Sequence, residues 1–267
     1  MSSSSLPSYN PEPSFQYTQT PNPEWKFGEK IESTIQGRAW LEGEKAGWKH
    51  VDTSTEDPAK LYPLLISGIV PRPIAFVSTV SEEGVENLAP FSWFNTVTSN
   101  PPTISISIVN GPERVKDSTH NIKLGHGFTV NMISEPWAEQ SNAASINAPP
   151  GVSEWPITGL TKEPSIHVKP PRVKESAFSM ECEDTLQLLQ TVDIIHPTTL
   201  IATTTLVIAH VRHIHIRNDV LNERGLVDPA KFRPLARMGD VTYGTIRDGF
   251  RIPRFNWEDE KDKVALL

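Results

Sequence analysis

Apolar and polar residues alternate along several stretches of the chain between residues 71 and 216. The clearest is residues 103–108, where strict alternation places three isoleucines on one face of a half-buried strand. Two more apolar runs, at residues 71–80 and 87–95, are joined by a polar turn. The pattern continues in three further runs, at residues 128–133, 178–186 and 200–216. Many short strands with few helices predict a mainly β protein, folded as an antiparallel barrel.

Two short helices are expected to interrupt these strands. The first should begin near Asp117 or Ser118, both good N-cap residues, and end at Gly125. The second should begin at Ser134, carry a proline in its first turn, and run towards residues 144–146.

The two ends of the chain differ in composition from its centre. Residues 1–23 are rich in serine and proline and are expected to form a disordered tail. Residues 24–55 contain three tryptophans, which rarely remain solvated, so this segment is expected to pack on the barrel as an N-terminal arm. Residues 56–250 form the predicted barrel domain, with a short helix and then a loop at 228–238. Residues 251–267 form a charged C-terminal tail, either solvated or binding a partner.

Composition and charge narrow the function classes. The chain has 267 residues, of which 37% are hydrophobic and 21% charged, as is ordinary for a globular protein. A net charge of −7 gives no support to nucleic-acid or anionic-membrane binding. There is no apolar run of the roughly 20 residues that a membrane helix needs, and no signal-peptide pattern. We expect a cytoplasmic protein, and its single cysteine fits a reducing compartment.

Several common catalytic patterns are missing from the sequence. His213 and His215 should share one face of a strand while His210 points the other way, so we expect no metal site. Cys182 lies in an alternating strand, where a core thiol is expected rather than a nucleophile. The sequence also lacks the hydrolase, P-loop and dinucleotide-binding fingerprints.

Four separated blocks of sequence resemble the flavin reductase-like, FMN-binding split-barrel family. They are PRPIAFVSTV with NLAPFSWFN (71–80 and 87–95), KDSTHNI (116–122), PPGVSEW (149–155), and RPLARMGD (233–240) followed by Tyr243. Together they cover roughly residues 60 to 245. The resemblance implies a six-stranded Greek-key split barrel, bound FMN, a homodimer, and hydride donation by NADH or NADPH.

The FMN phosphate needs N–H donors and at least one cation. Lys116 precedes a predicted helix start, and the resemblance places it and Ser118 beside the phosphate. The alternative is a helix cap at Asp117 or Ser118 with a solvated Lys116. Arg72, fixed between two prolines, is a second candidate for a phosphate or carboxylate; alternatively it pairs with a surface acid.

The resemblance assigns further residues to the cofactor and to a substrate pocket. Ser78 and Thr79 correspond to positions that contact the flavin ring and ribityl oxygens. The other implied cofactor-site residues are Asn87, Ala89, Ser92, Phe94, Asp117 and Asn121. Glu154 and Trp155 either line the substrate pocket or belong to a proline-stiffened surface loop.

A flavoenzyme needs no protein nucleophile, because the flavin itself accepts the hydride. No catalytic side chain is therefore assigned. The resemblance implies an oxidoreductase that passes electrons to free flavin, to oxygen or to a small organic acceptor, as a flavin reductase or a flavoprotein oxygenase. The alternatives are a non-catalytic flavin-binding electron-transfer protein and a structural barrel whose site is degenerate.

Overall fold

The computed structural model describes residues 6–12, 14–111, 114–183 and 190–265. The chain divides into two compact units. The first combines the residues up to 65 with those from 247 onwards, and the second spans residues 66–246. Within the described ranges, no helix has both the length and the apolar character needed to cross a membrane.

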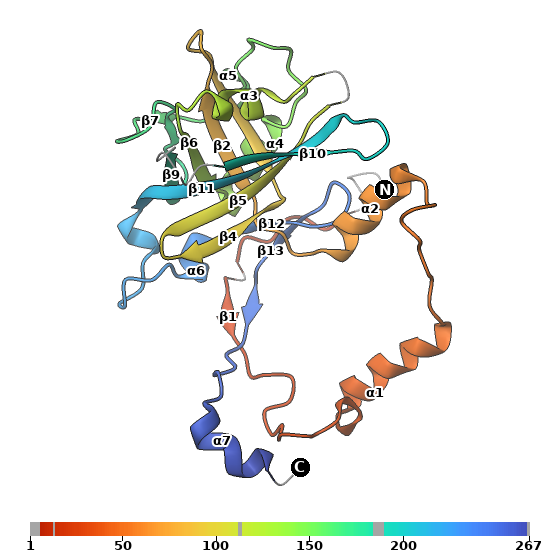
Figure 1. Ribbon diagram of the computed structural model, residues 1–267. Coiled ribbons are helices and arrows are strands. Elements are labelled where there is room, and N and C mark those ends of the chain that lie inside the picture. Colours follow the sequence, from red (N-terminus) through yellow and green to blue (C-terminus); the bar gives the residue numbers. More distant parts are fainter. Residues whose placement is uncertain (1–5, 13, 112–113, 184–189, 266–267) are drawn as a thin grey trace. The chain divides into compact units, whose positions relative to one another are not determined.

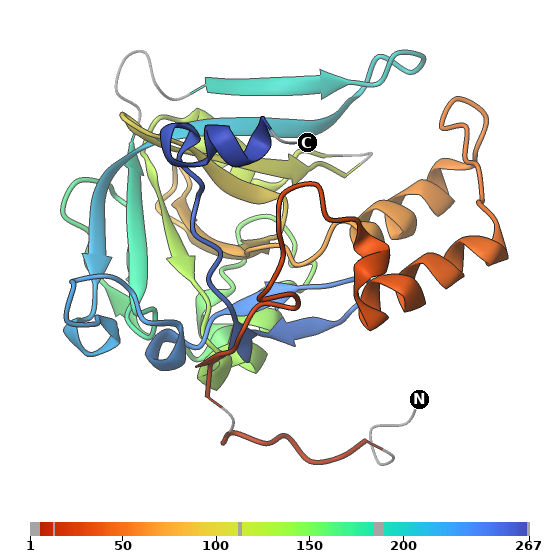
Figure 2. The same cartoon turned by 90° about the horizontal axis from the view of Figure 1, so that it is seen from below.

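A curled antiparallel sheet forms the body of the second unit. Its described residues form eight strands, two more than the resemblance implies. In spatial order they are β3 (Glu86–Phe91), β2 (Ala75–Val80), β6 (Phe128–Met132), β9 (Phe178–Glu183), β11 (Ala202–Ile216), β5 (Pro102–Val109) and β4 (Phe94–Ser99), with β10 (Gln190–Ile195) paired to β11. Figure 1 shows the split barrel that they form, and Figure 2 shows β10 beside the start of β11.

The alternating patterns explain where the cores lie. The three isoleucines of β5 are buried inside the barrel, as predicted. Strand β2 is buried on both faces, because Val77 packs in the barrel core while Phe76 packs in a second core outside it. The second core also contains large side chains from several connecting segments, among them Leu88, Trp137, Trp155 and Leu235.

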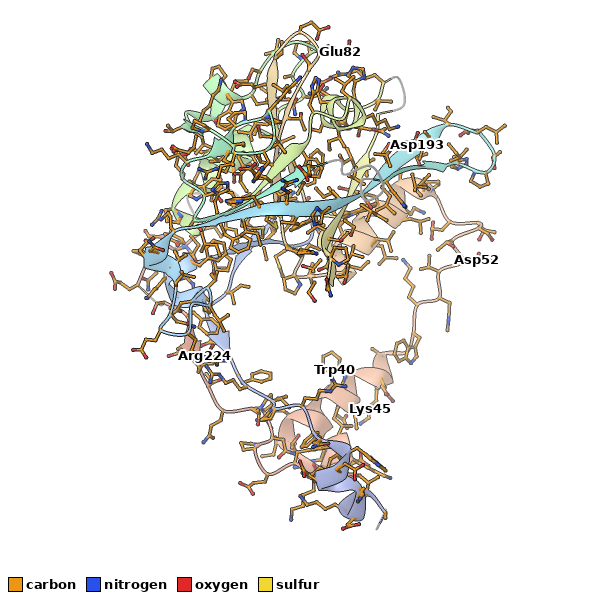
Figure 3. All side chains as sticks on the ribbon, turned by 60° about the vertical axis from the view of Figure 1, so that its left-hand side comes forward. Trp40, Lys45, Asp52, Glu82, Asp193 and Arg224 are labelled. Atoms are coloured by element: carbon orange, nitrogen blue, oxygen red, sulfur yellow. The ribbon has the colours of Figure 1, made fainter. Side chains whose placement is uncertain are left out.

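The predicted turn between β2 and β3 is confirmed. Val80 pairs with Glu86, and Gly84 adopts a left-handed backbone (φ +81°) that glycine accepts without strain. Glu82 lies at the tip of this hairpin (Figure 3). The predicted strand at residues 178–186 is β9 as far as Glu183, and its last residues fall outside the described ranges.

Both predicted helices are confirmed. Helix α3 (Asp117–Lys123) begins where predicted, but its N-cap is Lys116, whose side chain makes no capping hydrogen bond, and not Asp117 or Ser118. The second begins after Ser134 with a 3-10 turn, η4 (Glu135–Trp137), and continues as α4 (Ala138–Ala143). A short helix also forms as expected at α6 (Pro229–Phe232).

The loop predicted after α6 is wrong. Residues Leu235–Arg237 form strand β12, which pairs with β13 (Tyr243–Thr245). The backbone N–H of Leu235 donates to the Ile133 carbonyl at 3.1 Å, and Arg72 bridges to Arg237. These partners are remote in sequence, so a local pattern could not indicate them. The unit is completed by α5 (Trp155–Thr158), η5 (Asn218–Val220) and the strand pair β7 (Lys162–Glu163) and β8 (Arg172–Val173).

The first unit joins the two ends of the chain. Strand β1 (Gln16–Tyr17) pairs in parallel with β14 (Asp248–Gly249). The rings of Trp25, Phe27 and Phe255 contact one another. The unit's other elements are η2 (Ile31–Ser33), α1 (Ile35–Glu42), η3 (Gly43–Ala46), most of α2 (Pro58–Gly68), and α7 (Trp257–Val264) within the charged C-terminal segment.

Candidate functional site

Four predicted site residues form a buried polar cluster where β2 and β3 meet α3. Thr79 and Asn87 are cross-strand partners. The Asn121 side-chain amide donates to Thr79 Oγ1 at 3.0 Å. The Asn87 amide lies 2.9 Å from Ser118 Oγ. All four side chains are buried, so the cluster fixes the start of α3 against the hairpin.

Lys116 stands at the exposed edge of this cluster. Its backbone N–H donates to Asn110 Oδ1 at 3.3 Å, which fixes the residue at the start of α3. Its ammonium group pairs with no acidic side chain among the described residues, and no side-chain hydrogen bond caps the helix there. The first N–H groups of any α-helix also lack acceptors within the helix. A cation that makes no ion pair among the described residues and the first N–H groups of the helix therefore lie together at the start of α3.

Asp117 has a different role from its neighbours. Its carboxylate accepts from the Arg114 guanidinium at 2.8 Å, and Arg114 also donates to the Ala148 carbonyl at 3.0 Å. Asp117 thus ties the start of α3 to the loop that follows α4.

Ser78 is separated from this cluster by its own strand. It lies on the opposite face of β2, cross-strand from Leu88 and Thr129. The residue is fully buried, and its hydroxyl has no hydrogen-bond partner among the described residues.

Arg72 is engaged by the backbone of its own unit. Its guanidinium donates to the carbonyls of Ile66, Ile69 and Met238 at 2.5, 2.6 and 2.8 Å, and to Ser92 Oγ at 3.3 Å. The first two carbonyls lie at and just beyond the end of α2. Arg72 therefore holds that helix end, a role that neither alternative from the sequence described. Ser92 helps to hold the Arg72 guanidinium in this position by accepting its fourth hydrogen bond.

The remaining residues of the predicted hairpin segment have packing roles. Ala89 is half-buried opposite Val77. Phe94 is buried in the barrel core.

Glu154 and Trp155, predicted as pocket residues or loop residues, are both buried. Glu154 Oε2 accepts from the backbone N–H of Leu88 at 3.0 Å, and Leu88 belongs to the edge strand β3. Burial raises the pKa of Glu154, an effect that this hydrogen bond only partly offsets. With its amide turned, Asn87 would donate to the same carboxylate oxygen at 3.3 Å. Trp155 packs in the second core.

A second set of contacts supports α3 and was not found from the sequence. Asn110 accepts from Thr119 Oγ1 at 3.3 Å and donates to Thr205 Oγ1 at 3.0 Å. Thr205 donates to Asp193 Oδ1 at 2.6 Å, and the Lys123 ammonium lies 2.9 Å from both Asp193 oxygens. Asp193, labelled in Figure 3, thereby connects β10 to α3.

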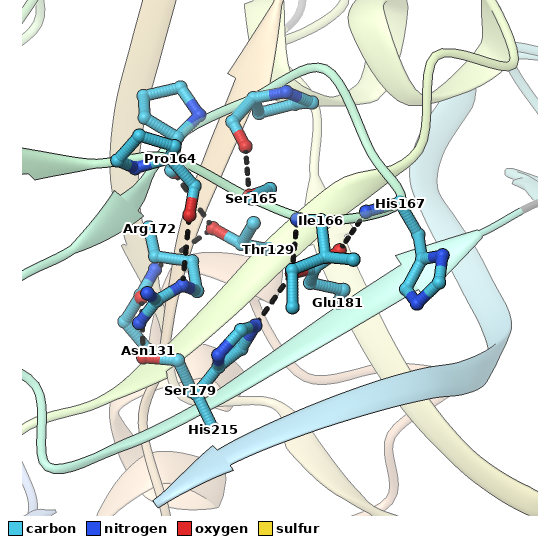
Figure 4. Close-up of polar contacts among 12 residues, drawn as sticks. Thr129, Asn131, Pro164, Ser165, Ile166, His167, Arg172, Ser179, Glu181 and His215 are labelled. Carbon is cyan, nitrogen blue, oxygen red and sulfur yellow. Dashed lines mark hydrogen bonds and ion pairs between the residues drawn. The ribbon is translucent and has the colours of Figure 1, made fainter. Parts of the chain in front are cut away.

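A different buried network surrounds Glu181 and Asn131 (Figure 4). Glu181 accepts from the backbone N–H groups of Ile166 and His167 at 2.8 and 2.6 Å, and its Oε1 lies 2.6 Å from His215 Nε2. Burial alone would raise the pKa of Glu181, but these hydrogen bonds lower it. Burial also lowers the pKa of His215.

The other sequence expectations for this region can be checked directly. The rings of His213 and His215 lie 4.6 Å apart, which confirms that they share a face. The prediction that His210 points the other way is wrong, because a β-bulge just before His213 shifts the alternation and leaves His210, cross-strand from Glu183, on the same face. The described residues include no group of three side chains placed to hold a metal ion. Cys182 is buried in the barrel core, as predicted, and burial raises the pKa of its thiol.

Comparison with known proteins gives consistent matches. Residues 67–236 match the family described as Flavin reductase like domain. An uncharacterized protein of Aquifex aeolicus is 36% identical over 188 residues, which are 70% of this chain and 90% of that protein.

Two solved structures are also similar. Nitrilotriacetate monooxygenase component B from Bacillus cereus has a TM-score of 0.72 and 29% identity, covering 77% of this chain and 99% of that chain. The 2-nitrobenzoate 2-nitroreductase NbaA of Pseudomonas fluorescens has a TM-score of 0.67 and 25% identity, covering 78% and 98%. The sequence blocks, the split barrel and these matches together show that the chain belongs to the flavin reductase-like domain family.

Proposed function

We propose that this protein is an FMN-dependent oxidoreductase that accepts hydride from NADH or NADPH. Its electrons pass to free flavin, to oxygen or to a small organic acceptor. Family membership supports flavin-dependent chemistry. Two similar structures, described as a monooxygenase component and a nitroreductase, support oxidoreduction as the reaction class.

One observation carries the choice of a phosphate-bearing flavin. The Lys116 ammonium has no acidic partner in the described ranges, and it lies beside Ser118 and the open start of α3. A cation, a hydroxyl and backbone N–H groups are the donors that a phosphate prefers. These residues fit the group, whereas Arg72 is already engaged by three carbonyls.

The side chains of the cluster have distinct tasks in this proposal. Lys116 supplies charge to the phosphate, and Ser118 is held in place by Asn87. Thr79 and Asn121 fix α3 to the hairpin, so that the donors keep their positions before binding. When bound, the flavin supplies the hydride-accepting centre, and the protein needs only to bind and orient it.

We also propose a homodimer, with β10 and its neighbours at the contact. Val192 and Ile194 of β10 are 46% and 47% exposed, and Val192 lies cross-strand from Leu206. An exposed apolar strand face of this kind is usually covered. Asp193, which lies between Val192 and Ile194, contacts Thr205 of β11 and Lys123 of α3. Because α3 carries the proposed phosphate site, loss of the dimer should also weaken flavin binding.

The dimer can be tested with Ile194→Lys, compared with Arg224→Glu at an exposed position. Light scattering across a dilution series should give a dimer for the control and a monomer for Ile194→Lys. A monomeric wild-type protein that keeps tight FMN at every concentration would contradict the proposal.

The function can be tested on the purified protein by an absorbance spectrum with added FMN, FAD and riboflavin. Anaerobic stopped-flow mixing with NADH or NADPH should then bleach the bound flavin rapidly. Tight FMN binding with no bleaching by either nucleotide would favour the electron-transfer protein. Failure to bind any flavin would favour a degenerate barrel.

A further inference from the structure

A cavity of about 400 Å³ lies at the opposite end of β6 from the α3 cluster. Helix α3 precedes β6 in the chain, whereas Ser134 and Trp137 of the cavity follow it. The other wall comes from the segment around η5 and α6, with Arg217, Lys231 and Arg233. The intervening strand makes this cavity separate from the proposed flavin site.

Two lining residues carry buried polar groups without a partner. Ser134 is 8% exposed and Trp137 is 6% exposed. Neither the Ser134 hydroxyl nor the Trp137 indole N–H makes a hydrogen bond among the described residues. Buried polar groups are nearly always satisfied, so two such donors beside one cavity indicate partners outside the protein chain.

The charged groups of the cavity favour an anion. Its lining has three cationic side chains and one acidic one. Two of the cations form ion pairs, Arg217 with Asp219 and Arg233 with Glu135. Lys231 is therefore the lining cation that makes no ion pair among the described residues.

The acid of the lining, Glu175, already accepts from the Thr161 backbone N–H at 3.1 Å through both oxygens. Lys231 donates to the Leu221 carbonyl at 2.8 Å, so its charge is not neutralised by that contact.

The position of Arg233 is also unusual. Its backbone is left-handed (φ +50°) at the C-cap of α6, a conformation that normally favours glycine. Its guanidinium pairs with the buried Glu135 at 2.8 Å. Strained backbone at a non-glycine residue is concentrated at binding sites, which supports a functional reason for arginine here.

We propose that this cavity binds a small organic carboxylate with an apolar body. Lys231, with Ser134 and Trp137 as neutral donors, would hold the carboxylate. Leu160, Val220 and Phe232 provide an apolar wall for the body of the ligand. A volume of about 400 Å³ is within the range of small-molecule sites. The proposal does not depend on the flavin.

Benzoate is a suitable probe, with benzamide as its uncharged counterpart, measured by calorimetry or ligand-observed NMR. Benzoate should bind with one site per chain, and benzamide at least tenfold more weakly. Prior saturation with FMN should leave benzoate binding unchanged. Binding of both compounds with equal affinity, absence of binding at millimolar benzoate, or displacement by FMN would each overturn the proposal.

Two variants locate the site. Lys231→Gln should weaken benzoate roughly tenfold, as expected for loss of a charge-assisted contact. Ser134→Ala should weaken it roughly threefold to tenfold without lowering the melting temperature of the ligand-free protein, because the hydroxyl has no partner to lose. Lys169→Gln, an exposed lysine outside the lining, is the control. Benzoate affinity that neither Lys231→Gln nor Ser134→Ala changes would place binding elsewhere and reject the assignment.

Discussion

The second unit holds two buried polar networks, one at the start of α3 and one around Asn131 and Glu181 on β6 and β9. The Asn131 side-chain amide makes four hydrogen bonds, donating to the Phe76 carbonyl and Thr129 Oγ1 and accepting from Val173 N–H and Ser179 Oγ. At the start of α3, by contrast, the Lys116 ammonium has no acidic partner in the described part of the chain.

This difference distinguishes a network that supports the fold from a network that can bind a ligand. A fully satisfied network in a buried environment stabilises one conformation and has no capacity left for a ligand. A network that leaves a cation and N–H donors open at its exposed edge is complete only when something else binds. The histidines near Glu181 are residue types that often bind metals, yet the α3 network is the better candidate site.

The largest expected effect comes from removing the centre of the complete network. Asn131→Leu removes four buried hydrogen bonds, although Thr129 Oγ1 keeps its bond to the Pro171 carbonyl, and should lower the free energy of unfolding by about 3–5 kcal/mol. Denaturant unfolding measures this, with the exposed Asn95→Ala as a control near zero. A loss below about 1 kcal/mol would show that this network is not a structural support.

Glu181→Gln tests the neighbouring buried carboxylate, which lies cross-strand from Thr129 and has its own set of partners. In the wild-type protein the carboxylate accepts hydrogen bonds from the backbone N–H groups of Ile166 and His167. In the variant, the amide nitrogen would face one of these N–H donors and could not accept from it. We expect a loss of about 1.5–3 kcal/mol at pH 7, the range for hydrogen bonds to charged groups, measured by denaturant unfolding without ligand. Flavin affinity per folded molecule should be unchanged. A stable variant with weakened FMN binding would reverse the roles of the two networks.

Lys116→Ala tests the open network. It should weaken FMN binding at least tenfold, because charge-assisted contacts contribute about 1.5–3 kcal/mol. Riboflavin, which lacks the phosphate, should bind the wild-type protein and the variant equally. Fluorescence quenching measures both ligands, and Lys116→Arg should retain most of the affinity. Stability should hardly change, because the side chain is exposed. Equal affinity of the wild-type protein for FMN and riboflavin would remove the phosphate assignment.

How far the sequence predicts the molecule depends on whether a signal is local. The alternating isoleucines of β5 and the polar start of α3 are local signals, and both elements form where predicted, although the N-cap of α3 is Lys116 and not Asp117 or Ser118. Strand β12 depends on pairing with β13 and with the residues before β2, and it was missed.

The site follows the same rule. The block at residues 116–122 is contiguous, so a resemblance can identify it. Asn110, Thr205 and Asp193 support the same helix from three separate segments, and no motif joins them. The prolines beside Arg72 indicated a rigid residue, but its carbonyl partners depend on the end of α2 and on Met238.

The smallest expected effect distinguishes Glu154 from Glu181. Burial raises the pKa of Glu154 in the folded protein above its ordinary value of 4.5, so folding favours its neutral form. At a pH below 4.5 the group is protonated in both folded and unfolded states. As the pH rises through and above 4.5, the unfolded chain ionises first, and the carboxyl group then costs stability.

Glu154→Gln keeps an oxygen that can accept from the Leu88 N–H and removes this cost. Lys116 and Asp117 also act on the carboxylate, in opposite directions, so the net gain should be small. We expect the variant to be more stable than the wild-type protein by less than about 1 kcal/mol at pH 7. The difference should disappear towards pH 4, because the pKa shift no longer contributes there. Thermal melts at a series of pH values, with Glu82→Gln as an exposed control, measure it. A variant less stable than the wild-type protein at pH 7 would mean that Glu154 is a satisfied carboxylate like Glu181.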